Sequence, residues 1–246
     1  MDIKSIVKDI LPEFQSKLSN IQDNNSQISW YPYGILDNFY HLDKLLSVPF
    51  RDISKLIDSK PVLDIGCADG SVGFLLESMG YGVDFCDYAP TNFNHLAGLK
   101  FLHSTLQSKS ELIETDLDSQ WSIDKKYGLV IFLGLLYHLK NPFYVLEKLS
   151  NHTRYCLLST RIFQQTKDSK HQLENVPVAY LLGPTEANHD ATNYWIFSRL
   201  GLLRLIERTG WIVHCERSFG CTYDSNPSDS DKDERFFCLL ESTRNQ

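Results

Sequence analysis

The segment Val62–Ser71, with the sequence VLDIGCADGS, constrains the fold of this chain more than any other. An apolar run that ends at Ile65 enters a turn containing Gly66 and Gly70, and a helix-compatible stretch follows. Glycines between a strand and a helix let the backbone approach a ligand closely, and the start of the helix offers unpaired N–H groups. We therefore expect a nucleotide-like ligand to bind at this turn.

Short apolar runs alternate with segments of helical period along the chain. This alternation predicts an α/β fold with a doubly wound, mostly parallel sheet of seven strands. The last two strands would pair as an antiparallel hairpin. The predicted strands are 61–65, 82–86, 111–115, 129–133, 154–159, 211–218 and 235–241, and the predicted helices include 92–107, 142–150 and 194–209.

The length of 246 residues suits one such sheet with additions. We expect residues 1–59 to form an N-terminal helical segment that covers the site and contributes to substrate binding. Residues 60–246 would form the ligand-binding domain, with an insertion at about 161–193.

An acidic residue follows the second predicted strand. Asp87 lies 23 residues after Asp64, at the place where a carboxylate can accept both hydroxyls of a ribose. The alternative is that the glycines only turn the chain and that Asp87 caps a helix. Turn and acidic strand end together favour the ribose site.

The first strand carries its own carboxylate, Asp64, before the glycines. In a dinucleotide enzyme this charge would face a pyrophosphate, which it would repel. A cationic sulfonium cofactor with an amino group would be attracted by it. The sequence therefore favours a cationic cofactor over NAD.

These motifs resemble those of the class I S-adenosylmethionine-dependent methyltransferases. VLDIGCADG is similar to their first motif, IETDLDS to the loop that reaches the adenine, and YGLVIFLGLLYHLKNP to their fourth-strand motif. The resemblance covers residues 60–160. One departure is Ala68, where many relatives have glycine; a positive φ at alanine would cost on the order of 1 kcal/mol.

The resemblance implies which residues hold S-adenosyl-L-methionine. Asp64 would lie near its amino group, Asp87 would accept the ribose hydroxyls, and Asp116 would read the adenine edge, with Asp118 as a rival for that role. The full implied set is Asp64, Gly66, Cys67, Gly70, Asp87, Tyr88, Asp116, Leu117, Leu133 and Gly134. No metal site is expected, because no stretch has the ligand spacing of a zinc site.

Methyl transfer from a sulfonium is an in-line displacement, so a base is needed only for a protonated acceptor. His138 follows the fourth predicted strand at the carboxyl edge of the sheet, and its ordinary pKa near ~6.5 suits proton removal. Its neighbour Tyr137 is an equally open choice. The alternative is that His138 only closes the turn before Pro142.

The acceptor site is expected to come from segments outside the core motifs. Tyr31 and Tyr33 belong to an aromatic cluster before the first strand, and such side chains form dry pocket walls. Arg161 and His189 come from the insertion, where Arg161 would pair with an acidic substrate group or with a carboxylate of the protein.

The charge balance bears on the acceptor. The sequence is similar to the branch that modifies the wobble uridine of tRNA and also to small-molecule O-methyltransferases. It carries 24 Lys and Arg against 31 Asp and Glu, a net charge of −7, whereas a tRNA-binding face is basic. We therefore expect a small-molecule acceptor, with oxygen favoured as the acceptor atom. The alternatives are a tRNA wobble-uridine methyl or carboxymethyl transferase and a non-catalytic nucleotide-binding module.

The six cysteines form no CxxC pair and lie mostly in apolar runs, which is typical of reduced, buried thiols. No run of about 18 apolar residues and no signal peptide is found. We expect a cytoplasmic protein that does not bind membranes.

Overall fold

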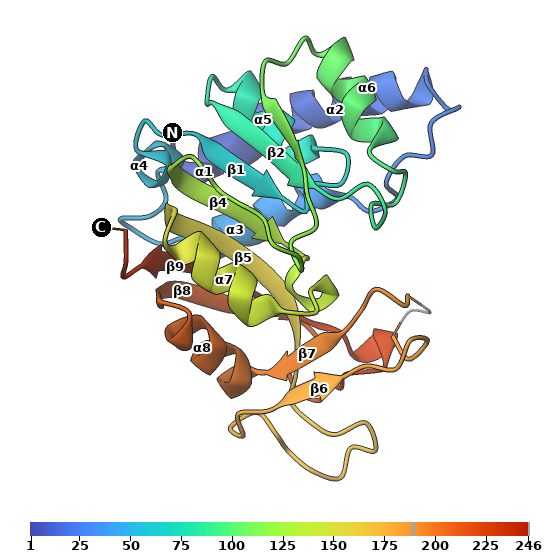
Figure 1. The fold of residues 1–246 in the computed structure, drawn as a ribbon, viewed down its shortest axis with the longest axis vertical. Coiled ribbons are helices and arrows are strands. Elements are labelled where there is room, and N and C mark those ends of the chain that lie inside the picture. Colours follow the sequence, from blue (N-terminus) through green and yellow to red (C-terminus); the bar gives the residue numbers. More distant parts are fainter. Residues whose placement is uncertain (188–189, 246) are drawn as a thin grey trace. The chain divides into compact units, whose positions relative to one another are not determined.

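The computed structural model describes residues 1–187 and 190–245, which divide into two compact units (Figure 1). Unit 1 consists of Met1–Asp116 and Trp121–Ile131, and unit 2 of Leu117–Gln120 and Phe132–Gln246. His189, one of the expected substrate residues, lies outside the described residues.

Unit 1 contains the predicted glycine turn. Its elements are α1 (Ile3–Ser5), the π-helical turn η1 (Ile6–Ile10), α2 (Leu11–Asp23), η2 (Ile35–Asp37), α3 (Asn38–Leu45), α4 (Ile53–Ile57), β1 (Val62–Ile65), α5 (Ser71–Ser78), β2 (Val83–Asp87), α6 (Ala97–Thr105), β3 (Glu111–Glu114) and β4 (Tyr127–Leu133), whose last two residues belong to unit 2.

The strands of unit 1 are parallel and follow the order β3-β2-β1-β4. All four residues of β1 are buried, and so are the first six of β4, as expected for strands covered on both faces. Pairing of Ile65 with Cys86 brings the carboxyl ends of β1 and β2 together. The glycine turn and Asp87 therefore meet at one edge of this sheet.

A close approach of backbones fixes one residue of β4. Gly128 donates its N–H to Pro61 O at 3.1 Å, and a Cβ at Gly128 would lie only 1.8 Å from Ile57 O of α4. Only glycine fits at this position without displacing the chain.

Unit 2 contains η3 (Leu136–His138), α7 (Pro142–Ser150), β5 (Thr153–Phe163), β6 (Ala179–Leu181), β7 (Trp195–Ser198), α8 (Arg199–Arg208), β8 (Trp211–Gly220), η4 (Ser230–Lys232) and β9 (Glu234–Ser242). The strand β9 pairs antiparallel with both β5 and β8. β7 lies parallel to β5 and antiparallel to β6.

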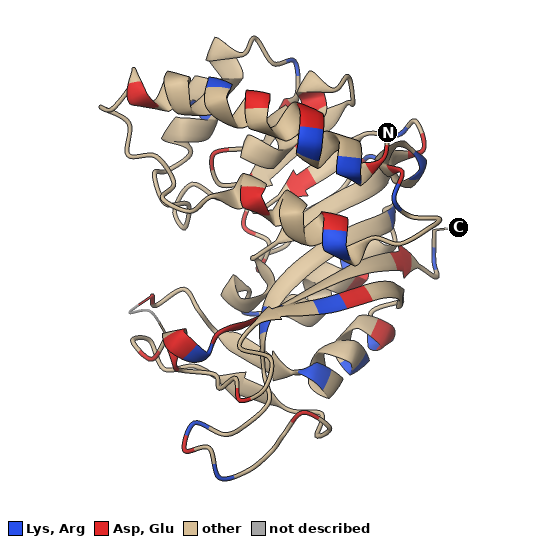
Figure 2. Ribbon diagram, turned by 180° about the vertical axis from the view of Figure 1, so that it is seen from behind, with Lys and Arg blue, Asp and Glu red and all other residues tan. Residues whose placement is uncertain are grey.

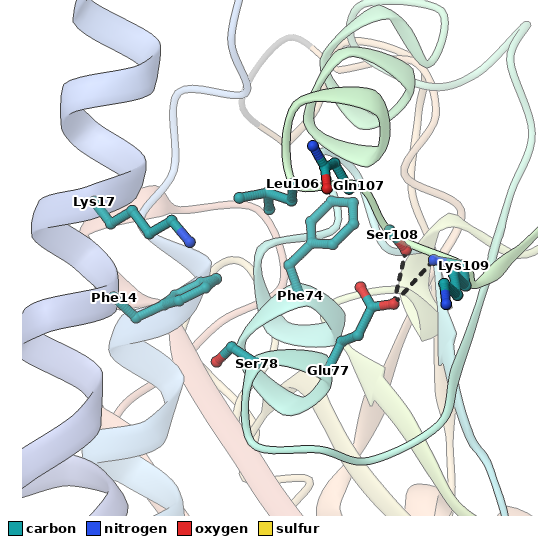
Figure 3. A pocket seen from close by; sticks show the side chains of 9 residues that line it. All are labelled: Phe14, Lys17, Phe74, Glu77, Ser78, Leu106, Gln107, Ser108 and Lys109. Atoms are coloured by element: carbon teal, nitrogen blue, oxygen red, sulfur yellow. Dashed lines mark hydrogen bonds between the residues drawn. The ribbon is translucent and has the colours of Figure 1, made fainter.

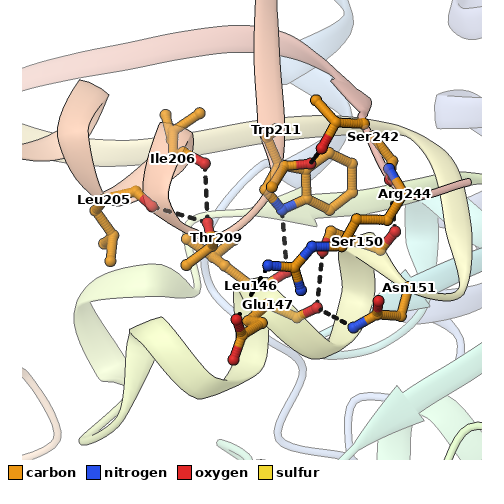
Figure 4. Close-up of polar contacts among 12 residues, drawn as sticks. Leu146, Glu147, Ser150, Asn151, Leu205, Ile206, Thr209, Trp211, Ser242 and Arg244 are labelled. Atoms are coloured by element: carbon orange, nitrogen blue, oxygen red, sulfur yellow. Dashed lines mark hydrogen bonds and ion pairs between the residues drawn. The ribbon is translucent and has the colours of Figure 1, made fainter.

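Polar contacts join α7 to the strands β8 and β9 (Figure 4). The indole N–H of Trp211 donates to Leu146 O at 3.0 Å, and the Ser242 hydroxyl donates to Ser150 O at 2.5 Å. The second of these bonds satisfies Ser150 O, a carbonyl group at the end of α7 that lacks a helical partner.

The predicted fold class is confirmed. All seven predicted strands are present, and the strands around the glycine turn are parallel while the C-terminal pair is antiparallel. Among the described residues two further strands, β6 and β7, were not predicted.

Two predicted helices begin too early. Residues 195–198 form β7, and α8 starts only where the Ser198 side chain accepts a hydrogen bond from Gly201 N. In the predicted helix 92–107, the helix α6 starts at Ala97, because His95 and Leu96 have φ values of 56° and 66°. Side chains that bond to nearby backbone groups compete with helix at such positions.

Acidic and basic residues are interspersed within each unit (Figure 2). Among the described residues no helix combines the length and the apolar character needed to cross a bilayer.

Candidate active site

Every second residue in the glycine turn of unit 1, from Gly66 to Gly70, has a backbone conformation that favours glycine. Gly66, Ala68 and Gly70 have φ values of 65°, 53° and 80°. The turn is closed by Gly66 N donating to Cys86 O at 2.8 Å and by Gly70 N donating to Cys67 O at 2.7 Å. Ala68 therefore occupies the left-handed conformation in which a Cβ is strained.

Asp87 is tied to this turn. One carboxylate oxygen accepts from Ala68 N at 2.8 Å and from the Asn92 amide at 3.2 Å, and the other accepts from Tyr88 N at 2.7 Å. Burial raises the pKa of Asp87 and outweighs these hydrogen bonds, which act in the opposite direction. A carboxylate has about four acceptor sites, and these three bonds leave one of them, on the oxygen that accepts from Tyr88 N, for a ligand hydroxyl.

Asp64 at the end of β1 is buried, with 3% of its surface exposed. Its oxygen accepts from Gly73 N in the first turn of α5 at 2.9 Å. Burial, with a contribution from the charge of Asp87, raises the pKa of Asp64 to about 7, although the Gly73 bond lowers it. Near neutral pH this carboxyl is therefore divided between its acid and its anion.

Asp69 connects the turn to the N-terminal segment, a role that the sequence did not assign. Its carboxylate accepts from Tyr31 N and from the Asn94 side chain, both at 2.7 Å. Asn94 in turn donates to Ser29 O at 2.9 Å. The ring of Tyr31 lies edge-on to Tyr33, with the centroids 5.3 Å apart. The two expected substrate tyrosines are thus brought together beside the turn.

The two candidate adenine carboxylates differ in their surroundings. Asp118 accepts from Lys140 N at 2.9 Å and from Asn141 N at 2.7 Å, so both of its oxygens hold the loop before α7. Asp116 lies just after β3, where Thr115 N donates to Asp87 O at 3.0 Å, and Leu117 after it is buried.

Cys67 in the glycine turn is also buried. Burial raises the pKa of its thiol, and the nearby carboxylates act in the same direction. The thiol is thus a small apolar group that contributes to the packing of the turn.

In unit 2, the residues after β4 form a tight turn. Leu133 ends the strand, and Gly134, with a φ of 72°, donates its N–H to the Ser159 hydroxyl at 3.0 Å. The short helix η3 then presents Tyr137 and His138 one after the other, with ring centroids 4.4 Å apart.

His138 is held by the segment before β7. Its Nδ1 lies 3.2 Å from Thr192 O and 3.0 Å from Thr192 Oγ1. Burial lowers the pKa of His138, partly offset by the charge of Asp190 and by the Thr192 contact, while the charge of Arg235 lowers it further. The imidazole is therefore neutral at physiological pH, as a general base must be.

Tyr137 has a partner that the sequence did not reveal. Arg235 donates to the Tyr137 hydroxyl at 2.9 Å and to Asp233 at 2.8 Å. Arg161, only 4% exposed, forms an ion pair with the same Asp233. Arg161 and Arg235 lie opposite each other in the β5–β9 register. A correct pairing of these two predicted strands would therefore have indicated that the two arginines are neighbours. Of the two contacts expected for Arg161, the structure shows the one with a carboxylate of the protein.

A hollow of about 300 Å³ in unit 1 lies at the end of α5 remote from the glycine turn (Figure 3). Phe14 and Lys17 of α2 face Phe74 and Glu77 of α5 across it, and Glu77 accepts from the Ser108 hydroxyl at 2.9 Å. None of the expected site residues lines this hollow.

Residues 39–216 match the family model described as a methyltransferase domain. A search of curated proteins gave no match.

Similar solved structures share the fold at low identity. The N-terminal domain of EvdMO1 with SAH bound is 16% identical, with 91% of this chain and 96% of that chain covered and a TM-score of 0.57. TehB from Haemophilus influenzae is 15% identical, with 84% and 67% covered and a TM-score of 0.54. The [4+2]-cyclase SpnF is 9% identical, with 74% and 75% covered and a TM-score of 0.56.

The family model covers well over half of the chain, and it includes the glycine turn, Asp87 and the segment that carries His138. The chain therefore belongs to the methyltransferase domain family, within the class I S-adenosylmethionine-dependent superfamily whose motifs it carries.

Proposed function

We propose that this methyltransferase binds S-adenosylmethionine at the glycine turn of unit 1 and methylates a hydroxyl group of a small molecule. His138 would act as the general base. The observation that carries the cofactor assignment is the pairing of Asp87 with Ala68 N, which places a carboxylate with spare acceptor capacity directly on the glycine turn.

The charges at the turn suit this cofactor. Asp64, Asp69 and Asp87 all have raised pKa values through burial, and none has a Lys or Arg partner among the described residues. Such a group of carboxyls favours a positively charged ligand. When bound, S-adenosylmethionine supplies a methyl group on a cationic sulfur, together with an ammonium group.

Different residues of the chain would contact different parts of the cofactor and the acceptor. Asp87 would accept the ribose hydroxyls, and Asp64 would attract the ammonium group. Asp116 would bind the adenine, with Leu117, Leu133 and Gly134 as further contacts. Tyr88 would stack near the adenine, and Tyr31 and Tyr33 would form an aromatic wall that excludes water from the acceptor.

The state of His138 supports oxygen as the acceptor atom. A hydroxyl acceptor must lose its proton as the new bond to carbon forms, and a neutral imidazole accepts such a proton. The lowered pKa of His138 keeps its ring in that form at physiological pH. Tyr137, held by Arg235, is the second candidate for contact with the acceptor.

Titration calorimetry with S-adenosylhomocysteine tests the cofactor site. Wild-type protein should bind it, Asp87→Ala should lose about tenfold or more in affinity, and Asp124→Ala, which removes an exposed loop carboxylate, should bind as wild type. Absence of binding by the wild type, or equal binding by Asp87→Ala, contradicts the assignment.

A scan of hydroxylated metabolites for release of S-adenosylhomocysteine tests the reaction. With an acceptor in hand, His138→Gln should lower kcat about 100-fold or more while leaving the affinity for S-adenosylhomocysteine unchanged. A product methylated on nitrogen or carbon contradicts the proposed acceptor. So does methylation of tRNA in a parallel assay, together with tRNA binding that depends steeply on salt. Binding without any product supports a non-catalytic module instead.

A further inference from the structure

Three residues of unit 2 form a chain of hydrogen bonds that begins at His138. Thr192 lies 54 positions later, in the segment that leads into β7, and its hydroxyl oxygen is 3.0 Å from His138 Nδ1. The same hydroxyl donates to Asp190 Oδ1 at 2.6 Å. Thr192 N also donates to that carboxylate oxygen, at 2.8 Å, so Asp190 holds Thr192 at two points.

The direction of each bond follows from the number of protons available. A threonine hydroxyl has one proton, and in Thr192 it is directed to Asp190, because a carboxylate only accepts. Toward His138, therefore, Thr192 Oγ1 can only accept. The second neighbour of Nδ1 is the Thr192 carbonyl oxygen at 3.2 Å, which is also only an acceptor. Two acceptors facing one ring nitrogen require that nitrogen to carry the proton.

We infer that Thr192 and Asp190 are positioning residues that hold neutral His138 in its Nδ1–H tautomer, so that Nε2 carries the lone pair that accepts a proton. Nε2 has no hydrogen-bond partner among the described residues. The catalytic consequence rests on the proposed function, whereas the tautomer itself does not.

The arrangement also prepares for the charge that forms during the reaction. As the acceptor oxygen bonds to the methyl carbon, the carbon–sulfur bond breaks with its electron pair going to sulfur, and the hydroxyl proton passes to Nε2. The resulting imidazolium keeps its Nδ1 proton between the two oxygens of Thr192. Asp190 stabilises the new positive charge through the Thr192 hydroxyl without taking a proton.

The other groups that face His138 act on its charge as well. The ring of Tyr137 is tilted against it, with 4.4 Å between centroids, and the positive charge of Arg235 opposes protonation. Asp190 supplies the negative charge that works against Arg235. Removing the charge of Asp190 should therefore lower the pKa of His138 further.

NMR of ring-¹⁵N-labelled protein tests the tautomer without cofactor or acceptor. The His138 signals are assigned by their loss in His138→Gln. In the wild type we expect a protonated Nδ1 and an unprotonated Nε2 near neutral pH. In Asp190→Asn the pKa of His138 should fall. A protonated Nε2 in the wild type, or an unchanged pKa in Asp190→Asn, overturns the inference.

The chain offers a matched control in the same unit. Thr166 donates to Asp168 at 2.6 Å in an exposed loop, the same pairing without a histidine ring at its end. Thr166→Val and Asp168→Asn should leave the His138 signals unchanged. Thr192→Val should lower the His138 pKa, and Thr192→Ser, which keeps the hydroxyl, should restore the wild-type value.

Kinetic measurements with an identified acceptor then distinguish a positioning role of Asp190 from a purely structural one. Asp190→Asn should lower kcat about tenfold and move the acidic limb of the pH–rate profile to lower pH, with the affinity for S-adenosylhomocysteine unchanged. A stability loss with an unmoved acidic limb contradicts the positioning role. If wild-type protein shows the expected tautomer but binds no S-adenosylhomocysteine, the proposed function fails while this inference stands.

Discussion

The carboxylate of Asp69 accepts a hydrogen bond from the backbone N–H of Tyr31, 38 residues earlier in the chain, at 2.7 Å. Asp69 belongs to the glycine turn, and Tyr31 belongs to the aromatic segment that precedes the first strand. A side chain of the proposed cofactor turn thus fixes the backbone of the proposed acceptor wall. Substitutions in the turn should therefore change the mobility of the N-terminal segment.

Replacing Asp69 by alanine should free that segment. Asp69 is 2% exposed, and its loss removes the carboxylate that accepts from Tyr31 N and one of the two acceptors of the Asn94 amide. We expect a loss of about 2 kcal/mol in the free energy of unfolding, because unmet buried donors cost about 1–3 kcal/mol. Hydrogen exchange should show the Tyr31 amide exchanging at least tenfold faster. The exposed Asp124→Ala is the control, and equal exchange in both variants would contradict the tie.

Replacing Asp64 by asparagine should stabilise the protein in a pH-dependent manner. The pKa of Asp64 is raised from 3.8 to about 7. The folded state therefore holds this proton more tightly than the unfolded state, and ionisation costs stability as the pH rises from about 4 to 7. A shift of about three units corresponds to about 4 kcal/mol at most. Asparagine keeps an oxygen for Gly73 N and avoids this cost.

Urea denaturation at two pH values checks this expectation. At pH 3, below the unfolded pKa of 3.8, the wild type and Asp64→Asn should be nearly equal in stability, and at pH 8 the variant should be more stable. The same variant should bind S-adenosylmethionine less tightly at pH 8, since it lacks the negative charge. A variant that is less stable than the wild type at pH 8 would show that Asp64 carries no ionisation cost.

The sequence identified the glycine turn because its signal is local. The strand, the glycines and the acidic strand end all lie within Val62–Asp87, and the structure brings them together through β1–β2 pairing. The contacts of Asp69 with Tyr31 and of Arg235 with Tyr137 join residues far apart in the chain. No pattern of spacing reveals such contacts, since they depend on how the chain is packed.

The errors in the predicted secondary structure also come from contacts with residues elsewhere in the chain. Residues 194–209 have a helical period, but Trp195–Ser198 pairs with both β5 and β6, and the Ser198 side chain caps the helix that follows. Aromatic and β-branched residues at the start of an amphipathic segment fit a strand as well as a helix. Which state forms is decided by the neighbouring strands.

Replacing Ala68 by glycine should stabilise the protein. Ala68 has a φ of 53°, where a Cβ is strained and glycine is not. We expect a gain of about 1 kcal/mol, read from the midpoint of thermal or urea unfolding. Ala97→Gly, at the exposed first residue of α6, is the control and should be destabilising by up to about 1 kcal/mol. A loss of stability in Ala68→Gly would show that the buried methyl group outweighs the strain.

Replacing Gly128 by alanine should destabilise unit 1 more than any substitution at the surface. The added Cβ would lie 1.8 Å from Ile57 O, and the obstacle is backbone, which cannot move aside as a flexible side chain can. We expect a loss of about 3 kcal/mol or more, at the upper end of overpacking effects. Gly82→Ala is the matched control, because the nearest atom to its Cβ is Pro61 Cβ at 3.9 Å, an ordinary contact. Chemical denaturation of both variants should show a large loss for Gly128→Ala alone; equal stability would mean that α4 can withdraw from β4 at no cost.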